Sequence, residues 1–297
     1  MDMTPAGEAF LPTPGGSPFN VAVGLGRLGT PAGFVGRIST DPFGDSLIRR
    51  LTENGVDTSL CVRGPEPTTL AFIHPQPDGG EIYSFYAERS ADRLLLPRDL
   101  PPALPGVDAL HFGSFSLALE PGGSALRMLL QREAGRRLIT LDPNVRPSLL
   151  PARDVYRPLL EGLIGRADLV KVSDVDADWI YPGETAARVA SRWRGLGAAL
   201  VVVTRGLEGS WASNGDAEAA APVHPVPVVD TVGAGDAFMS GLLAWLSSHR
   251  RLSREALLAI DEAELGDALR FAALVSALTC TRAGAEPPTL SEVSAAA

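Results

Sequence analysis

Residues 228–246, VVDTVGAGDAFMSGLLAWL, place two carboxylates and two glycines directly before an apolar helical pattern. The pattern predicts a helix from about residue 235, so the loop brings Gly233, Ala234 and Gly235 to its N-terminus. Unpaired amides and the positive end of the helix dipole bind anions, and small residues let a phosphate approach the backbone. Asp236 lies in the first turn, where a carboxylate could take a proton from an attacking hydroxyl. The spacing favours phosphoryl transfer, although an acid in a first helical turn is common without any catalytic role.

Several segments occur in an order that is typical of one enzyme family. DTVGAGDAFMSGLL (230–243) resembles the C-terminal signature of the ribokinase-type (PfkB) sugar kinases, and GGSPFNVAVGLGRLG (15–29) with VGRISTDPFG after it resembles their N-terminal signature. The intervening and following matches are HFGSFSL (111–117), LDPNVRP (141–147), KVSD (171–174), VVVTRGLEGS (201–210) and TRAGAE (281–286). The likeness covers nearly the whole chain and is closest to bacterial fructokinases. It implies transfer of the γ-phosphate of ATP to a hydroxyl of a small sugar, D-fructose above others, with Mg²⁺ and with K⁺ as a further candidate cofactor.

Strand and helix patterns alternate along most of the chain. The predicted strands are 33–38, 109–115, 137–142, 168–173, 199–204 and 225–230. The predicted helices are 19–28, 43–54, 121–135, 151–165, 184–195, 235–248 and 264–280. This alternation predicts an α/β fold with a mostly parallel sheet that is covered on both faces. The resemblance implies a ribokinase-like three-layer α/β/α sandwich that forms one domain over residues 1–297.

Residues 56–90 interrupt the helical rhythm. SLCVR, TTLAFIHP and EIYSFYA have strand patterns, and residues 77–80 have a turn sequence. We expect a small antiparallel β-lid that is built mainly from residues 56–90 together with the N-terminal segment 5–13. Members of the family often form homodimers through this lid, so a homodimer is a further expectation.

The resemblance assigns roles to individual residues on the nucleotide side. It implies that Asp236 is the catalytic base and that the amides of Gly233, Ala234 and Gly235 form an anion hole. The positions expected to contact ATP are Asn144, Arg146, Ser173, Thr204, Gly206, Gly209, Gly233 and Gly235. Asp176 takes the place of the family's usual glutamate near Mg²⁺, with a shorter reach. The positions expected around a monovalent cation are Asp230 and the backbone carbonyls of Val232, Thr279, Arg282 and Gly284.

The sugar side is assigned in the same way. The expected contacts are Asp2, Gly15, Gly16, Asn20, Arg89 and Asp236. Arg89 follows FYAE where the family more often has FYR. The family also has a buried first strand before the aspartate that corresponds to Asp2. We therefore expect Met1 to be an internal methionine, with the natural start upstream.

Composition excludes other classes of function. A formal net charge of −9 and the lack of long basic runs argue against nucleic acid or an anionic membrane as partners. No apolar run reaches the roughly 18 residues that a membrane span needs. Cys61 and Cys280 are isolated, which favours the cytoplasm, and the four histidines are too scattered for a metal site. Lys171 is the only lysine and no P-loop sequence is present, so we expect arginine, Mg²⁺ and amides to neutralise phosphate charge.

Three rival interpretations remain open from the sequence. GLGRLG (24–29) spells the dinucleotide-binding pattern of dehydrogenases, but it falls inside a helical pattern instead of opening a helix after a strand. A 2-keto-3-deoxygluconate kinase shares the paired glycines and the DxNxR motif, although an acidic sugar calls for an additional arginine clamp; a nucleoside kinase is a more distant alternative. The third is a catalytically impaired family member that lacks its first strand.

Overall fold

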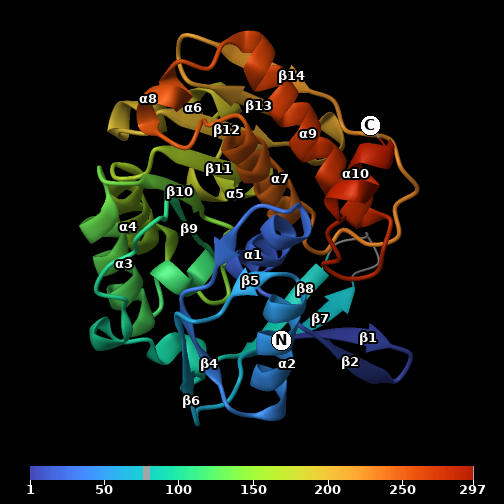
Figure 1. Cartoon of the computed structure of the whole chain (residues 1–297). Helices are drawn as coiled ribbons and strands as arrows, with labels where there is room; N and C mark the ends of the chain where they lie inside the picture. The colour runs from blue at the N-terminus through green and yellow to red at the C-terminus, as the bar shows by residue number, and fades with distance from the viewer. Residues whose placement is uncertain (76–80, 297) are drawn as a thin grey trace.

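A mostly parallel sheet organises the chain, of which a computed structural model describes residues 1–75 and 81–296. Its six strands lie in the order β14-β13-β12-β11-β10-β9, and all neighbours from β9 to β12 are parallel, while β13 and β14 are antiparallel to theirs (Figure 1). The strands are β9 (Ala109–Gly113), β10 (Leu138–Asp142), β11 (Leu169–Ser173), β12 (Leu200–Thr204), β13 (Ser210–Ser213) and β14 (Glu218–Ala221).

Helices cover both faces of this sheet. Alternate strand residues pack in opposite directions: Val170 and Val172 belong to the core beneath one helical layer, and Leu169 belongs to the core beneath the other. The first layer contains α3 (Gly122–Glu133), α4 (Arg153–Ile164), α5 (Asp174–Ile180) and α6 (Ala186–Leu196). The second contains α7 (Ala234–Ser248), α8 (Arg254–Leu258) and α9 (Glu262–Cys280) (Figure 1). The predicted three-layer α/β/α arrangement is confirmed.

The remaining helices flank these layers. α1 (Ser17–Arg27) packs on α7, and α2 (Pro42–Glu53) packs near α1. α10 (Leu290–Ala296) follows α9 and lies against its C-terminal half. Short 3₁₀ helices span Ala91–Leu94, Pro97–Asp99, Ser114–Leu117 and Gly206–Glu208. Among the described residues, no helix is both long and apolar enough to cross a bilayer.

A second, small sheet lies beside the sandwich. Its four strands, in the order β2-β1-β7-β8, are β1 (Asp2–Ala6), β2 (Ala9–Thr13), β7 (Leu70–Pro75) and β8 (Glu81–Tyr86) (Figure 1). β1 and β7 are parallel, and the other pairs are antiparallel. The turn predicted at residues 77–80 lies outside the described residues.

The structure corrects the expected lid in one respect. β5 (Val56–Asp57) and β6 (Cys61–Gly64) do not join the small sheet. Each forms a parallel two-stranded pair, with β3 (Ala32–Gly33) and β4 (Gly36–Ser39) respectively. The single strand predicted at residues 33–38 is therefore two short strands, β3 and β4.

The strand predicted at residues 225–230 is wrong. The segment belongs to no sheet, and Val228 and Val229 are exposed. Pro225 and Pro227 have no amide hydrogen, so this stretch could not complete the ladder of a central strand. The sequence pattern also missed the short helix α5.

The GLGRLG pattern is explained by packing. A Cβ atom added to Gly24 would lie 2.3 Å from the Ser240 hydroxyl, and one added to Gly26 would lie 2.0 Å from the Asn54 carbonyl oxygen. Both residues lie within α1 and allow it to approach α7 and the chain after α2 closely. The helix does not begin at these glycines, so the context of a dinucleotide site is absent here.

We predict that Gly24→Ala destabilises the protein by about 1–3 kcal/mol, because the added methyl must displace α1 from α7. Urea denaturation monitored by circular dichroism measures the loss. Gly162→Ala in α4 is the matched control, since its Cβ would meet no atom within 4 Å, and it should leave stability unchanged or raise it by up to ~1 kcal/mol. Equal stabilities of the two variants would contradict this packing argument.

Candidate active site

The N-terminus of α7 has a backbone geometry that only glycine accommodates well. Gly233 is the N-cap residue, with a left-handed φ of 76°. A Cβ atom at this position would also lie 2.5 Å from the Cβ of Ala285, so a side chain is excluded on two grounds. The next residues, Ala234, Gly235 and Asp236, form the first helical turn, whose amides have no acceptor within the helix. As predicted, Gly233, Ala234 and Gly235 lie at the N-terminus of a helix.

Asp236 is buried inside this first turn, with only 7% of its surface exposed. The Asn20 amide donates a hydrogen bond of 2.8 Å to Oδ2, and the Asn144 amide donates to Oδ1 over 3.5 Å. Asn20 belongs to the first turns of α1, and Asn144 follows β10 with a left-handed φ of 39°. Three separate elements thus meet at one carboxylate.

Burial changes the acidity of this group. Desolvation is the largest influence and raises the pKa of Asp236 from 3.8 to about 6, while the hydrogen bond from Asn20 acts in the opposite direction. Two buried charges contribute further: Asp142 raises the pKa and Lys171 lowers it. A carboxyl group with a pKa near 6 is ionised at neutral pH, yet it accepts a proton more readily than an exposed one.

Among the expected sugar-binding residues, Asn20 contacts this carboxylate directly. Asp2 in β1 covers Gly15 so closely that a Cβ on Gly15 would lie 1.9 Å from the Asp2 carboxylate. Gly16 then caps α1 with a φ of 127°, and its carbonyl accepts the Asn20 amide N–H. The Asp2 carboxylate thus lies against Gly15, the Gly16 carbonyl binds the Asn20 amide N–H, and the Asn20 side chain binds Asp236.

Arg89, the remaining expected sugar contact, lies after the last strand of the small sheet. It is exposed in the turn after β8, with a left-handed φ of 55°. It follows β8 by three residues, and its contact with a sugar stays a prediction.

The expected nucleotide-side residues follow the carboxyl ends of neighbouring strands. Thr204 ends β12 and Gly206 begins the 3₁₀ turn after it. Ser173 ends β11, and its hydroxyl accepts the Asp176 amide as the N-cap of α5. These ends of parallel strands lie at one edge of the sheet, where open α/β sheets bind ligands.

Two residues of this group have contacts that the sequence did not predict. Gly209 has a structural requirement of its own, because a Cβ there would lie 2.1 Å from the Ala221 carbonyl oxygen of β14. Arg146 donates to the Val145 carbonyl, and its guanidinium lies 5.4 Å from the centre of the Tyr83 ring in β8. Arg146 thus connects the sandwich with the small sheet.

Asp176 has properties that suit a site for a cation. Burial, followed by the charge of Asp142, raises the pKa of its carboxyl. A divalent ion nearby would relieve this destabilisation of the ionised form. Among the described residues, however, no group of three or more histidine, cysteine, aspartate or glutamate side chains is arranged to enclose a metal ion.

Asp230 joins two loops that the sequence had assigned to a monovalent cation. Its carboxylate accepts the Val232 amide at 3.0 Å and the Gly284 amide at 2.7 Å. The Arg282 amide in turn donates to the Thr279 carbonyl. The carboxylate therefore holds the segments 230–232 and 279–284 side by side.

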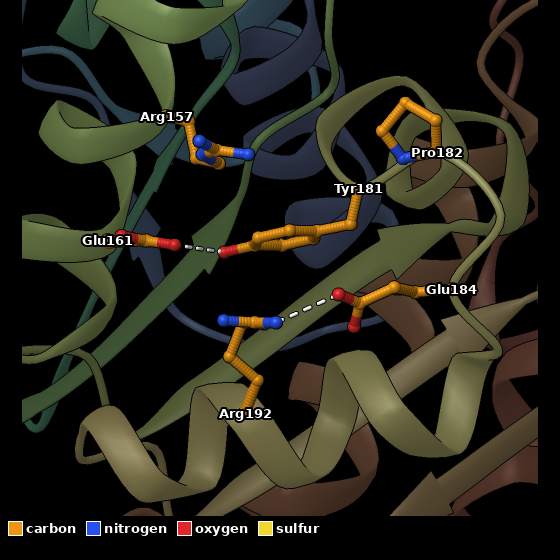
Figure 2. Close-up of a pocket in the computed structure, with 6 residues that line it drawn as sticks. All are labelled: Arg157, Glu161, Tyr181, Pro182, Glu184 and Arg192. Carbon is orange, nitrogen blue, oxygen red and sulfur yellow. Dashed lines mark hydrogen bonds and ion pairs between the residues drawn. The ribbon is translucent and has the colours of Figure 1, made fainter.

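A surface hollow of about 400 Å³ lies elsewhere, between α4 and α6 (Figure 2). Two hydrogen-bonded pairs line it: the Tyr181 hydroxyl donates to Glu161, and Arg192 binds Glu184. None of the predicted site residues lines it. We therefore assign the candidate site to the N-terminus of α7 and not to this hollow.

The sequence and the fold were compared with those of known proteins. The model of the "pfkB family carbohydrate kinase" matches residues 2–292. The chain belongs to this family. A fructokinase of Rhizobium leguminosarum bv. trifolii is 39% identical over 264 residues, which cover 89% of this chain and 81% of the relative.

Solved structures agree with the family assignment. A fructokinase from Xylella fastidiosa with bound ATP has a TM-score of 0.89 and 32% identity, over 99% of this chain and 94% of the other. A fructokinase from Vibrio cholerae O395 with fructose, ADP and a calcium ion has a TM-score of 0.86 and 27% identity, with the same coverage. The chain is thus a phosphotransferase with an alcohol acceptor, as predicted.

One part of this pfkB kinase's site was missed. The sequence analysis expected arginine, Mg²⁺ and amides to neutralise phosphate charge and gave Lys171 no part in the site, but Lys171 reaches the anion hole from β11. Its Nζ would be 3.1 Å from a Cβ on Gly235, and it forms a 2.9 Å ion pair with Asp142. A single lysine inside an apolar strand was the available signal, since lysine is almost never buried unless it is paired.

The raised pKa of Asp236 predicts the pH dependence of the kinase. A general base works only when it is ionised, so kcat/KM should fall tenfold per pH unit below about 6 and level off above it. Steady-state rates between pH 4.5 and 8 measure this limb. Asn20→Ala removes a donor that favours the ionised form, so it should move the limb to higher pH. A limb near pH 4 in the unmodified enzyme would contradict the argument.

Proposed function

We propose that this pfkB kinase phosphorylates D-fructose with ATP. The observation that carries the proposal is the buried Asp236 carboxylate, which two asparagine amides hold at the glycine-rich N-terminus of α7. The similarity to fructokinases along nearly the whole chain supports fructose as the sugar. ATP is proposed as the donor because the X. fastidiosa relative was solved with it.

The geometry supports a direct transfer. Asp236 takes the proton from a fructose hydroxyl while that oxygen attacks the γ-phosphorus, and the bond between the γ-phosphorus and the bridging oxygen breaks to release ADP. The amides of Gly233, Ala234 and Gly235 stabilise the charge on the transferring group. Asp2, Gly15, Gly16 and Asn20 hold the sugar against Asp236, and Arg89 approaches it from the small sheet.

The triphosphate would lie along the carboxyl ends of β10 to β12. Its proposed contacts are Asn144, Arg146, Ser173, Thr204, Gly206 and Gly209. Mg²⁺, held in the neighbourhood of Asp176, would neutralise charge on the β- and γ-phosphates.

We further propose a monovalent cation beside the anion hole. The Asp230 carboxylate draws together the loops that carry the carbonyls of Val232, Thr279, Arg282 and Gly284. Backbone carbonyls are the ligands that K⁺ prefers in proteins. Equal turnover in potassium chloride and in tetramethylammonium chloride of the same ionic strength would reject this site.

The chain is proposed to act as a single domain and to dimerise through the small sheet. Both main cores share the six-stranded sheet, which supports one folding unit. Phe10, Ile82 and Tyr86 are exposed on one face of the small sheet, where the Phe72 ring contacts the rings of Phe10 and Tyr86. Such a patch is typical of an interface. A monomeric mass in sedimentation experiments at micromolar concentration would reject the dimer.

We propose the cytoplasm as the compartment, because ATP is the substrate and Cys61 and Cys280 are both free thiols.

A panel of sugars tests the proposed substrate. We expect ADP release with fructose to exceed that with ribose, tagatose and 2-keto-3-deoxygluconate in kcat/KM, as a coupled assay would measure. Preference for the acidic sugar would replace the proposal with the alternative kinase, and no turnover with any sugar would favour an impaired family member.

Asp236→Asn should lower kcat by about 10²–10⁴-fold and leave ATP binding largely unchanged, because it removes the base but keeps the shape of the turn. Turnover and calorimetric ATP titration measure the two effects. Asp154→Asn is the matched control, since Asp154 is also an acid in a first helical turn but is exposed on α4. Similar kcat values for the two variants would show that Asp236 is an ordinary helix-start acid.

A further inference from the structure

Lys171 lies in an unusual place for a lysine. It belongs to the strand face that packs against α7 and α9, where its neighbour two residues before, Leu169, is part of the core. Only 4% of its surface is exposed. Its ammonium also approaches the N-terminus of α7, the positive end of the helix dipole. Both burial and the dipole oppose a positive charge here, so the surroundings must compensate for it.

Asp142 provides that compensation and connects Lys171 with the catalytic carboxylate. Oδ2 of Asp142 accepts the Lys171 ammonium at 2.9 Å, and Oδ1 accepts the Asn144 amide N–H at 3.2 Å. This second bond fixes the turn in which Asn144 has its left-handed φ of 39°. The Asn144 side chain then reaches Oδ1 of Asp236.

The Lys171–Asp142 pair is almost fully withdrawn from water, with side chains 5% and 2% exposed. Stability alone does not explain why the chain has a buried ion pair here, because a protein with well-packed apolar residues at such positions is often at least as stable. Each oxygen of the Asp142 carboxylate binds a different partner, Lys171 on Oδ2 and the Asn144 amide N–H on Oδ1. The Asn144 side chain also contacts Asp236. This division of contacts points to orientation as the role of the pair.

We propose that Lys171 is a positioning residue for Asp236. Its ammonium holds the Asp142 carboxylate in the orientation that fixes the Asn144 turn, and the Asn144 amide in turn orients Asp236 toward the sugar hydroxyl. This inference rests on the proposed function, because it concerns the same base. It adds the only lysine of the chain to the site, through contacts that involve no bound ligand.

Two double variants separate orientation from stability. Lys171→Met with Asp142→Leu replaces the pair by apolar side chains and removes the acceptor for the Asn144 amide. Lys171→Met with Asp142→Asn also removes both charges but retains an acceptor oxygen of the same shape. Urea denaturation first establishes that each variant is folded.

We expect the Met–Leu variant to retain most of its stability and to lose about 10²-fold in kcat, with KM for the sugar changed less than threefold, because a misplaced catalytic group costs about that much. The Met–Asn variant should recover at least fivefold of this loss and remain below the unmodified enzyme. A Met–Leu variant within threefold of the unmodified kcat would show that the pair is only structural. A Met–Asn variant equal to either the Met–Leu variant or the unmodified enzyme would also overturn the proposal.

A crystal structure of the Met–Leu variant gives a readout that does not depend on turnover. The proposal predicts that the Asn144 turn changes and that its amide leaves the 3.5 Å contact with Asp236. An unchanged turn would overturn the proposal even if the enzyme had another substrate. Failure of the unmodified enzyme to phosphorylate any sugar, with the turn changed as predicted, would count against the proposed function alone.

Discussion

The structure depends on the burial of one carboxylate at a helix N-terminus. Asp236 loses contact with water, which raises its pKa to about 6, and it regains partners through Asn20 and Asn144. Removing a carboxylate from water is costly unless hydrogen bonds replace the lost hydration. The partners come from α1 and from the turn after β10. Both hydrogen bonds to Asp236 therefore form only when α1, α7 and the sheet are correctly placed.

Close backbone approach is the means by which these elements reach one point. Gly24 allows α1 to pack on α7, Gly15 accommodates the Asp2 carboxylate, and Gly233 provides the left-handed start of α7 against Ala285. Each of these positions excludes a Cβ atom for a different steric reason. The glycines of both signatures therefore have packing functions as well as the proposed contacts with ligands, and the same residues link the fold to the site.

The sequence predicted those parts that local patterns determine. The helix starting near Gly235, the alternation of strands and helices, and the proximity of Asn20 to Asp236 all follow from short-range periodicity or from family motifs. What it missed depends on distant partners. The strand at 225–230 is an exception, because Pro225 and Pro227 within the segment already argue against a central strand. The strands β5 and β6 pair with β3 and β4 and not with the small sheet. The burial of Lys171 was missed because its partner, Asp142, lies 29 residues away, although a lysine inside an apolar strand was a local signal of it.

In the proposed reaction, a sugar hydroxyl meets Asp236 while the terminal phosphate lies on the amides before it. A crystal structure of Asp236→Asn with fructose and ATP would show this arrangement, because the substitution allows both substrates to remain intact. We expect a fructose hydroxyl within hydrogen-bond distance of the residue 236 side chain and the γ-phosphate against the amides of Gly233, Ala234 and Gly235. A triphosphate bound away from α7, or a sugar whose hydroxyls all point away from residue 236, would contradict the account.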